Sequence, residues 1–182
     1  MIRITNNFHM SEIIEQKTQE ILNRFEITSI PVSVERIAAA LDIQIKMAPS
    51  SDFSGLLIRK SHTALIGINK EEPHTRQRFT IAHELGHYFL DKRKDAFVDN
   101  KASIEYRDNK SHASRSAKES RANMFAAALL MPRPHVKKDF KRMVSKSGVF
   151  LEDHLSLLAD KYLVSREAMQ IRLKELGLIR PL

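Results

Sequence analysis

In the segment RFTIAHELGH, residues 78–87, two histidines stand four residues apart and a glutamate directly follows the first. Side chains four residues apart lie one above the other on an α-helix, so His83 and His87 can present both imidazoles to one cation. Glu84 then lies beside that cation, where a carboxylate can act as general base towards a metal-activated water. Gly86 leaves space beside the metal or a packed neighbour. The stretch therefore predicts a helix that carries a catalytic metal, with Zn²⁺ as the expected ion and manganese or iron left open.

A catalytic zinc normally takes three protein ligands, so a third ligand is needed. The chain has no cysteine, which excludes a thiolate, and Arg93 stands where an elongated His-based motif would place a third histidine. A downstream carboxylate remains. Glu119 is the leading candidate because the run that follows it is apolar, and Glu105 is the alternative. The apolar residues after Glu119 are Ala122, Phe125, Ala126, Leu129 and Leu130.

Hydrophobic periodicity predicts an α+β fold that is mostly helical. Helices are expected at about 11–25 with Ser11 as N-cap, after Pro31, from Pro73 to about Leu90, at about 116–131, after Pro134, and at 151–162 and 165–176. Short strands are expected at 43–47, 54–59 and 63–69, the last two forming a hairpin. The polar residues 98–115 predict a mobile connection with one weak strand at 103–107. The expected architecture is therefore a set of helices around a small three-stranded sheet.

Composition limits the class of protein. A chain of 182 residues fits one compact domain, or one domain with a small helical appendage. No apolar run approaches the roughly 18 residues that span a bilayer, which predicts a chain without membrane segment or signal peptide. The absence of cysteine is compatible with a reducing compartment, so we expect a cytoplasmic protein.

Positive charge is concentrated in one segment. The chain has 30 Lys and Arg against 22 Asp and Glu, and residues 92–146 hold 15 basic and 6 acidic side chains, a surplus of nine. Such a surface attracts acidic partners, including nucleic acid. No aromatic residues alternate with the basic ones as a single-strand stacking surface would need, so a solvated face is the favoured interpretation.

Two separated motifs together resemble the ImmA/IrrE family of metallo-endopeptidases: RFTIAHELGH at 78–87, and ESRANMFAAALLMP at 119–132. The resemblance begins near Ile30 and includes a tail, LADKYLVSREAMQIRL at 158–173, that is similar to the family's helix-turn-helix-like end. It implies a zincin-like, gluzincin-type peptidase domain at 1–148, with a helical pair at 149–182 packed on it.

The same resemblance implies a role for each site residue. His83, His87 and Glu119 would bind one Zn²⁺ per chain, and Glu84 would be the general base. Asn123, one turn after Glu119, would be a packing residue or would support a ligand. For the group that stabilises the oxyanion, Tyr106 and His112 are candidates. Tyr88 and His135 are further candidates of the same standing.

The resemblance also implies the substrate, a separate helix-turn-helix repressor of the Cro/CI type that the peptidase cleaves with narrow specificity. Two alternatives stay open. One is a non-catalytic regulator that binds a repressor or DNA, and the other is the toxin of a toxin-antitoxin module. For the tail, packing is favoured over DNA reading, because its apolar residues indicate burial: Leu163, Val164, Met169, Ile171 and Leu173.

Overall fold

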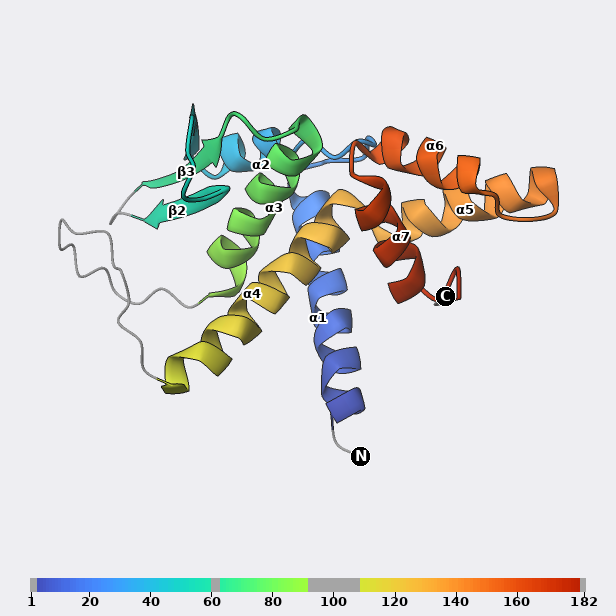
Figure 1. Cartoon of the computed structure of the whole chain (residues 1–182), viewed down its shortest axis with the longest axis horizontal. Helices are drawn as coiled ribbons and strands as arrows, with labels where there is room; N and C mark the ends of the chain where they lie inside the picture. Colours follow the sequence, from blue (N-terminus) through green and yellow to red (C-terminus); the bar gives the residue numbers. More distant parts are fainter. Residues whose placement is uncertain (1–2, 60–62, 92–108, 181–182) are drawn as a thin grey trace.

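The computed structural model describes the backbone of residues 3–59, 63–91 and 109–180, and the side chains of 9–59, 63–91, 116–145 and 148–180. The described residues form seven helices and three strands (Figure 1). The helices are α1 (Arg3–Arg24), α2 (Val34–Ala40), α3 (His74–Leu90), α4 (Asn109–Leu130), α5 (Arg133–Ser147), α6 (Glu152–Tyr162) and α7 (Arg166–Glu175). The strands are β1 (Ile43–Ala48), β2 (Gly55–Arg59) and β3 (Ala64–Asn69). The mostly helical α+β class is confirmed.

The three strands form one mixed sheet in the order β1-β3-β2. β2 and β3 pair antiparallel, with Leu57 opposite Ile66, which confirms the predicted hairpin. β1 pairs parallel to β3. Along β3, every second side chain is buried, as expected for a strand with one face on the core. The order makes β2 an edge strand, and this edge faces the candidate site described below.

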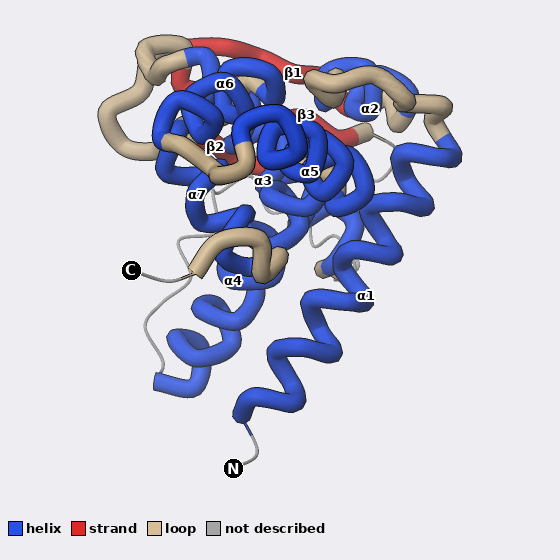
Figure 2. Tube along the Cα trace, turned by 90° about the vertical axis from the view of Figure 1, so that its right-hand side faces the viewer, coloured by secondary structure: helices blue, strands red, loops and turns tan. Residues whose placement is uncertain are grey.

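The elements are layered from the sheet to the long helices. α3 contacts the sheet on one side and α4 on the other, and α4 packs in turn on α1 (Figures 1 and 2). α2 lies beside α3 and contacts β1. The core is apolar at these contacts, with Ile66, Leu85, Phe125 and Leu129 fully buried. α3 and α4, which carry the candidate site, are therefore held together by a packed interior.

Two helices are longer than the sequence predicted. α1 begins at Arg3, so Ser11 lies inside the helix rather than at its N-cap, and α4 begins at Asn109 rather than near 116. Neither 3–10 nor 109–115 contains glycine or proline, so nothing in these segments interrupts a helix. The strand predicted at 103–107 lies outside the described residues.

Buried polar contacts anchor α7. Arg172 is only 3% exposed, its Nη1 lies 2.6 Å from Glu15 Oε1 of α1, and its Nε donates a hydrogen bond to the carbonyl of Met131 at 3.1 Å. Val164, Met169 and Leu173 are buried as predicted. Ile171 is not: it is 49% exposed, because it lies on a different face of α7 from the residues that pack. The predicted burial of Ile171 was wrong.

Candidate metal centre

Two helices bring three potential ligands together. His83 and His87 project from α3, and Glu119 projects from α4 across from them. The Nε2 atoms of the two histidines are 3.0 Å apart. One oxygen of Glu119 lies 3.2 Å from His83 Nε2, and the other lies 3.4 Å from His87 Nε2. The structure thus brings together the three residues that the sequence singled out as ligands.

The spacing of these atoms fits a tetrahedral ion. Tetrahedral bonds of 2.0–2.1 Å to nitrogen and oxygen place any two ligand atoms about 3.3–3.4 Å apart. The two Nε2 atoms are 3.0 Å apart, and each lies 3.2 or 3.4 Å from a different oxygen of the Glu119 carboxylate, so all these separations are close to that edge length. Burial, followed by the neighbouring His87, lowers the pKa of His83, which favours the neutral imidazole that a metal ligand requires. The nitrogen and oxygen donors, the distances between them and the neutral form of His83 all suit Zn²⁺.

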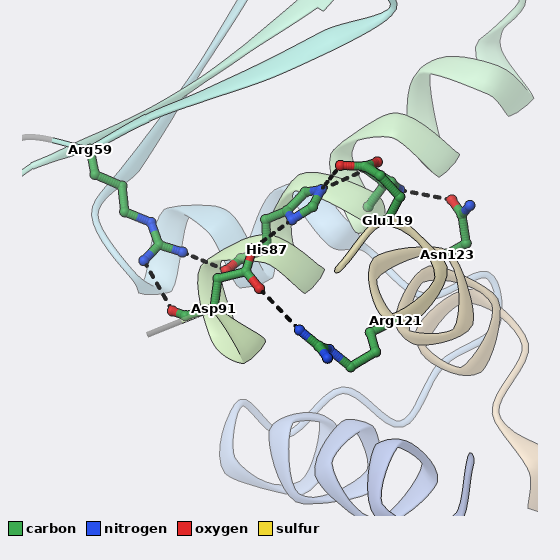
Figure 3. Close-up of polar contacts among 7 residues, drawn as sticks. Arg59, His87, Asp91, Glu119, Arg121 and Asn123 are labelled. Carbon is green, nitrogen blue, oxygen red and sulfur yellow. Dashed lines mark hydrogen bonds and ion pairs between the residues drawn. The ribbon is translucent and has the colours of Figure 1, made fainter. Parts of the chain in front are cut away.

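A hydrogen bond at the opposite ring nitrogen orients each histidine. His83 Nδ1 donates to Asn123 Oδ1 at 2.9 Å, and His87 Nδ1 donates to Asp91 Oδ2 at 2.8 Å (Figure 3). Each bond fixes the tautomer that leaves the Nε2 lone pair directed at the shared point. Asn123 therefore contacts His83, one of the three candidate ligands.

Sequence reasoning missed Asp91. This residue ends α3 four positions after His87, and that spacing was a usable signal because i,i+4 side chains meet on a helix. Two arginines surround it: Arg121 Nη2 of α4 lies 3.8 Å from Asp91 Oδ1, and Arg59 of β2 donates to the carbonyls of His87 and Asp91 (Figure 3). The sheet, α3 and α4 thus all hold this end of the site.

Glu84 is a buried carboxylate beside the ligands. Its side chain is only 8% exposed, and burial raises its pKa to about 7, with Glu119 adding to the rise and His87 opposing it. A Cβ at Gly55 would lie 3.4 Å from Glu84 Oε1 and would overlap Thr80 Cγ2. β2 therefore passes close to this carboxylate only because position 55 has no side chain.

These groups open into one cleft of about 1110 Å³. β2, α3, α4 and α7 form its walls, and the metal centre lies among its lining residues. Other residues that line the cleft are Ser54, Gly55, Leu56, Arg76, Glu84, Met124, Ala127, Met131, Glu167, Ile171 and Glu175.

The other candidates do not join this group among the described residues. Tyr106 and Glu105 lie outside the described residues, and so does the side chain of His112, whose backbone is part of α4. Tyr88 packs edge-on against Phe89, with 5.5 Å between the two ring centroids. The Cζ atom of Arg59 lies over the Tyr88 ring, 5.1 Å from its centroid. His135 lies on α5 and does not line the cleft. The oxyanion-stabilising group stays unassigned.

Comparison with known proteins places the chain. A model of the M78 peptidase family, described as the IrrE N-terminal-like domain, matches residues 38–174. The chain belongs to this family. The match covers both motifs and the four elements that surround the cleft, and it makes the chain a member of a metallopeptidase family.

One curated relative of this M78 family member is Metallopeptidase ImmA of Bacillus subtilis (strain 168), which is 40% identical over 67 residues. The alignment covers 37% of this chain, and it spans about a third of the relative, 34% of its length. Among the described residues, no helix combines the length and apolar character needed to cross a membrane.

Removal of the Asp91 carboxylate should weaken metal binding without unfolding this M78 family member. We expect Asp91→Ala to lower zinc affinity by about 10–100-fold, because His87 loses the acceptor that orients it. Asp91→Asn, whose amide oxygen can still accept from Nδ1, should retain most of the affinity. Competition with a chromophoric chelator measures both. Equal losses in the two variants would show that the hydrogen bond is not what matters.

Gly86 allows α3 and α4 to approach each other. A Cβ at this position would lie 3.1 Å from both Cα and the carbonyl oxygen of Ala122, so a helix backbone would have to move. We expect Gly86→Ala to lower the free energy of unfolding by about 1–3 kcal/mol, although alanine is the better helix former. Gly67→Ala is the control, because its Cβ would meet only side-chain atoms of Leu56. Urea denaturation should show the larger loss at Gly86.

The raised pKa of Glu84 should make the stability of the metal-free protein depend on pH. Between about pH 4.5 and 7 the folded state binds a proton at Glu84 that the unfolded state releases, so stability should fall as the pH rises through this window. Below the window both states are protonated, and above it both are ionised. The difference is on the order of 3 kcal/mol. Glu84→Gln should flatten this part of the profile, and an unchanged slope would contradict the assignment.

Proposed function

We propose that this M78 family member is a zinc-dependent endopeptidase of narrow specificity that acts in the cytoplasm. His83, His87 and Glu119 would hold one Zn²⁺, and Glu84 would be the general base. The observation that carries the proposal is the convergence of the three ligand atoms beside a buried carboxylate in a single cleft.

When bound, zinc supplies Lewis-acid chemistry: it polarises the scissile carbonyl and makes a water molecule easier to deprotonate. Glu84 accepts the proton of the attacking water as the oxygen–carbon bond forms. It then returns that proton to the amine nitrogen as the carbon–nitrogen bond breaks. In the metal-free protein, burial raises the pKa of Glu84 to about 7. The low exposure of Glu84 limits competition from bulk water for both transfers.

The edge strand supports a peptide as the substrate. β2 hydrogen-bonds to β3 along one side, and Ser54, Gly55 and Leu56 line the cleft at its start. An extended peptide can pair with the free edge of such a strand through main-chain hydrogen bonds. Since the strand passes close to Glu84 at Gly55, a peptide bound in this way would have its backbone near the general base.

For the identity of the substrate, family resemblance favours a separate helix-turn-helix repressor of the Cro/CI type. The structure gives less support to DNA as the partner of α7. Arg172 is buried against Glu15, and Arg166 Nη2 lies 2.6 Å from Glu152 Oε2, so neither arginine of this helix is directed at a groove. The exposed lysines of α5 remain available to an acidic partner.

The test is cleavage of purified Cro/CI-type repressors from the source organism by the zinc-loaded chain, followed by intact-mass spectrometry. We expect one internal cut, which gives an N-terminal and a C-terminal fragment whose masses add up to the repressor plus one water, and no cut with Glu84→Gln. Absence of cleavage of every repressor, and of an unfolded protein such as casein, would contradict the peptidase proposal.

A further inference from the structure

The cleft extends beyond the metal centre to a wall formed by α7. Glu167, Ile171 and Glu175 line this part of the cleft, and all three are exposed. They are spaced four residues apart, so they form one row along a single face of the helix. The row therefore presents an apolar side chain between two carboxylates to whatever occupies the cleft.

The apolar member of this row has no packing role. Ile171 is 49% exposed, while Met169 and Leu173 on the same helix are fully buried. Further apolar side chains line the cleft: Met124 and Ala127 of α4, and Met131 directly after this helix. Apolar surface exposed inside a cleft, rather than scattered over the molecule, is typical of a ligand-binding site. This part of the cleft can accept one apolar side chain.

The charge of the wall is opposite to that of the whole chain. The protein carries a formal net charge of +8, but the two charged residues of α7 that line the cleft are both glutamates. Apart from the metal centre, the charged lining residue of opposite sign is Arg76, whose Nε lies 3.9 Å from Glu72 Oε2. Glu175 Oε2 lies 3.8 Å from Nη1 of the buried Arg172, which offsets part of its charge, so Glu167 contributes most of the charge of the wall. Basic side chains are therefore favoured along α7, most strongly beside Glu167, and acidic ones are repelled.

The spacing of the row matches an extended peptide. Four residues of α-helix advance about 6 Å, which places the two carboxylate-bearing positions about 12 Å apart with Ile171 midway. Alternate residues of an extended chain are about 6.7 Å apart and point to the same side. The ion pair of Arg172 with Glu15 and its bond to Met131 hold α7 at this wall, so the row is fixed before a ligand arrives.

We propose that the α7 wall selects the substrate: it binds an extended segment in which an apolar side chain has a lysine or arginine two residues away on one or both sides. The proposal rests on the proposed peptidase function only for its cleavage readout, because binding to the wall can be measured separately.

The experiment uses short quenched-fluorescent peptides with a central leucine whose second neighbours are lysine, glutamine or glutamate. The zinc-loaded chain gives kcat/KM for each peptide, and the zinc-loaded Glu84→Gln variant gives the binding affinity by fluorescence anisotropy. The variants are Glu167→Lys, Glu175→Gln and Ile171→Ser. Asp160→Lys is the matched control, because Asp160 is an exposed acid of α6 that does not line the cleft.

We expect lysine-flanked peptides to be preferred over glutamate-flanked ones, and the preference to shrink as salt is added. Glu167→Lys should lower the preference by roughly three- to tenfold, Glu175→Gln should lower it less, and Asp160→Lys should leave it unchanged. Ile171→Ser should reduce the advantage of a central leucine over a central serine.

Two outcomes overturn the proposal. One is binding or cleavage that is indifferent to the flanking charge, or that changes equally in Glu167→Lys and Asp160→Lys. The other is the absence of any binding and any cleavage. Binding with the expected charge preference but without cleavage would support the α7 wall and contradict the peptidase function. Cleavage without a charge preference would support the peptidase function and contradict the α7 wall.

Discussion

Replacement of Glu84 by glutamine is expected to lower kcat for peptide cleavage by about 10²–10⁴-fold while zinc stays bound, as is typical when a general base is lost. Glutamine has nearly the same shape as glutamate but cannot accept a proton at neutral pH. Glu84 is not one of the three residues whose ligand atoms converge, so the Glu84→Gln substitution leaves these candidate ligands intact. Parallel measurement of zinc content and of cleavage rate checks both halves of this prediction.

The control for this substitution is Glu71→Gln, which makes the same chemical change at an exposed position. It should leave the cleavage rate unchanged. Cleavage that survives in Glu84→Gln would remove the carboxylate from the reaction. Loss of zinc together with activity would mean that Glu84 supports the metal rather than the proton transfer.

Replacement of Glu119 by alanine is expected to reduce zinc affinity by more than the 10–100-fold typical of a residue that only orients a ligand. The carboxylate supplies the oxygen donors that close the triangle with His83 and His87. Its side chain is 49% exposed, so the substitution itself should cost little stability. Zinc titration against a competing chelator measures the loss, and circular dichroism checks the fold.

Glu20→Ala is the control here, because Glu20 is an exposed glutamate of α1 away from the cleft. It should bind zinc as the unsubstituted protein does. If Glu119→Ala retained one zinc with affinity within a few-fold of the original, Glu119 would not be the third ligand, and Glu105 would become the candidate to test.

The sequence was sufficient for features that depend on local spacing. His83 and His87 are one helical turn apart, so the helix that contains them brings them together whatever the rest of the fold does. Glu119 was found because an isolated carboxylate preceded an apolar run, and α4 does bury Ala122 and Phe125 against α3. The strand pattern at 43–69 likewise predicted the hairpin of β2 and β3.

Features that depend on contacts between distant segments were not predictable. The orientation of Ile171 follows from which face of α7 packs, and that face carries the buried Met169 and Leu173 and the contact of Arg172 with Glu15, which is far away in the sequence. The closeness of Gly86 to Ala122 likewise depends on how α3 and α4 meet.

The metal centre can be tested by the zinc content of the purified, unsubstituted chain. The chain is dialysed against a zinc-containing buffer, free metal is removed, and zinc is measured by inductively coupled plasma mass spectrometry. The geometry of His83, His87 and Glu119 predicts one zinc per chain. A protein that remains folded and binds no zinc under these conditions would contradict the metal centre, and with it the proposed peptidase.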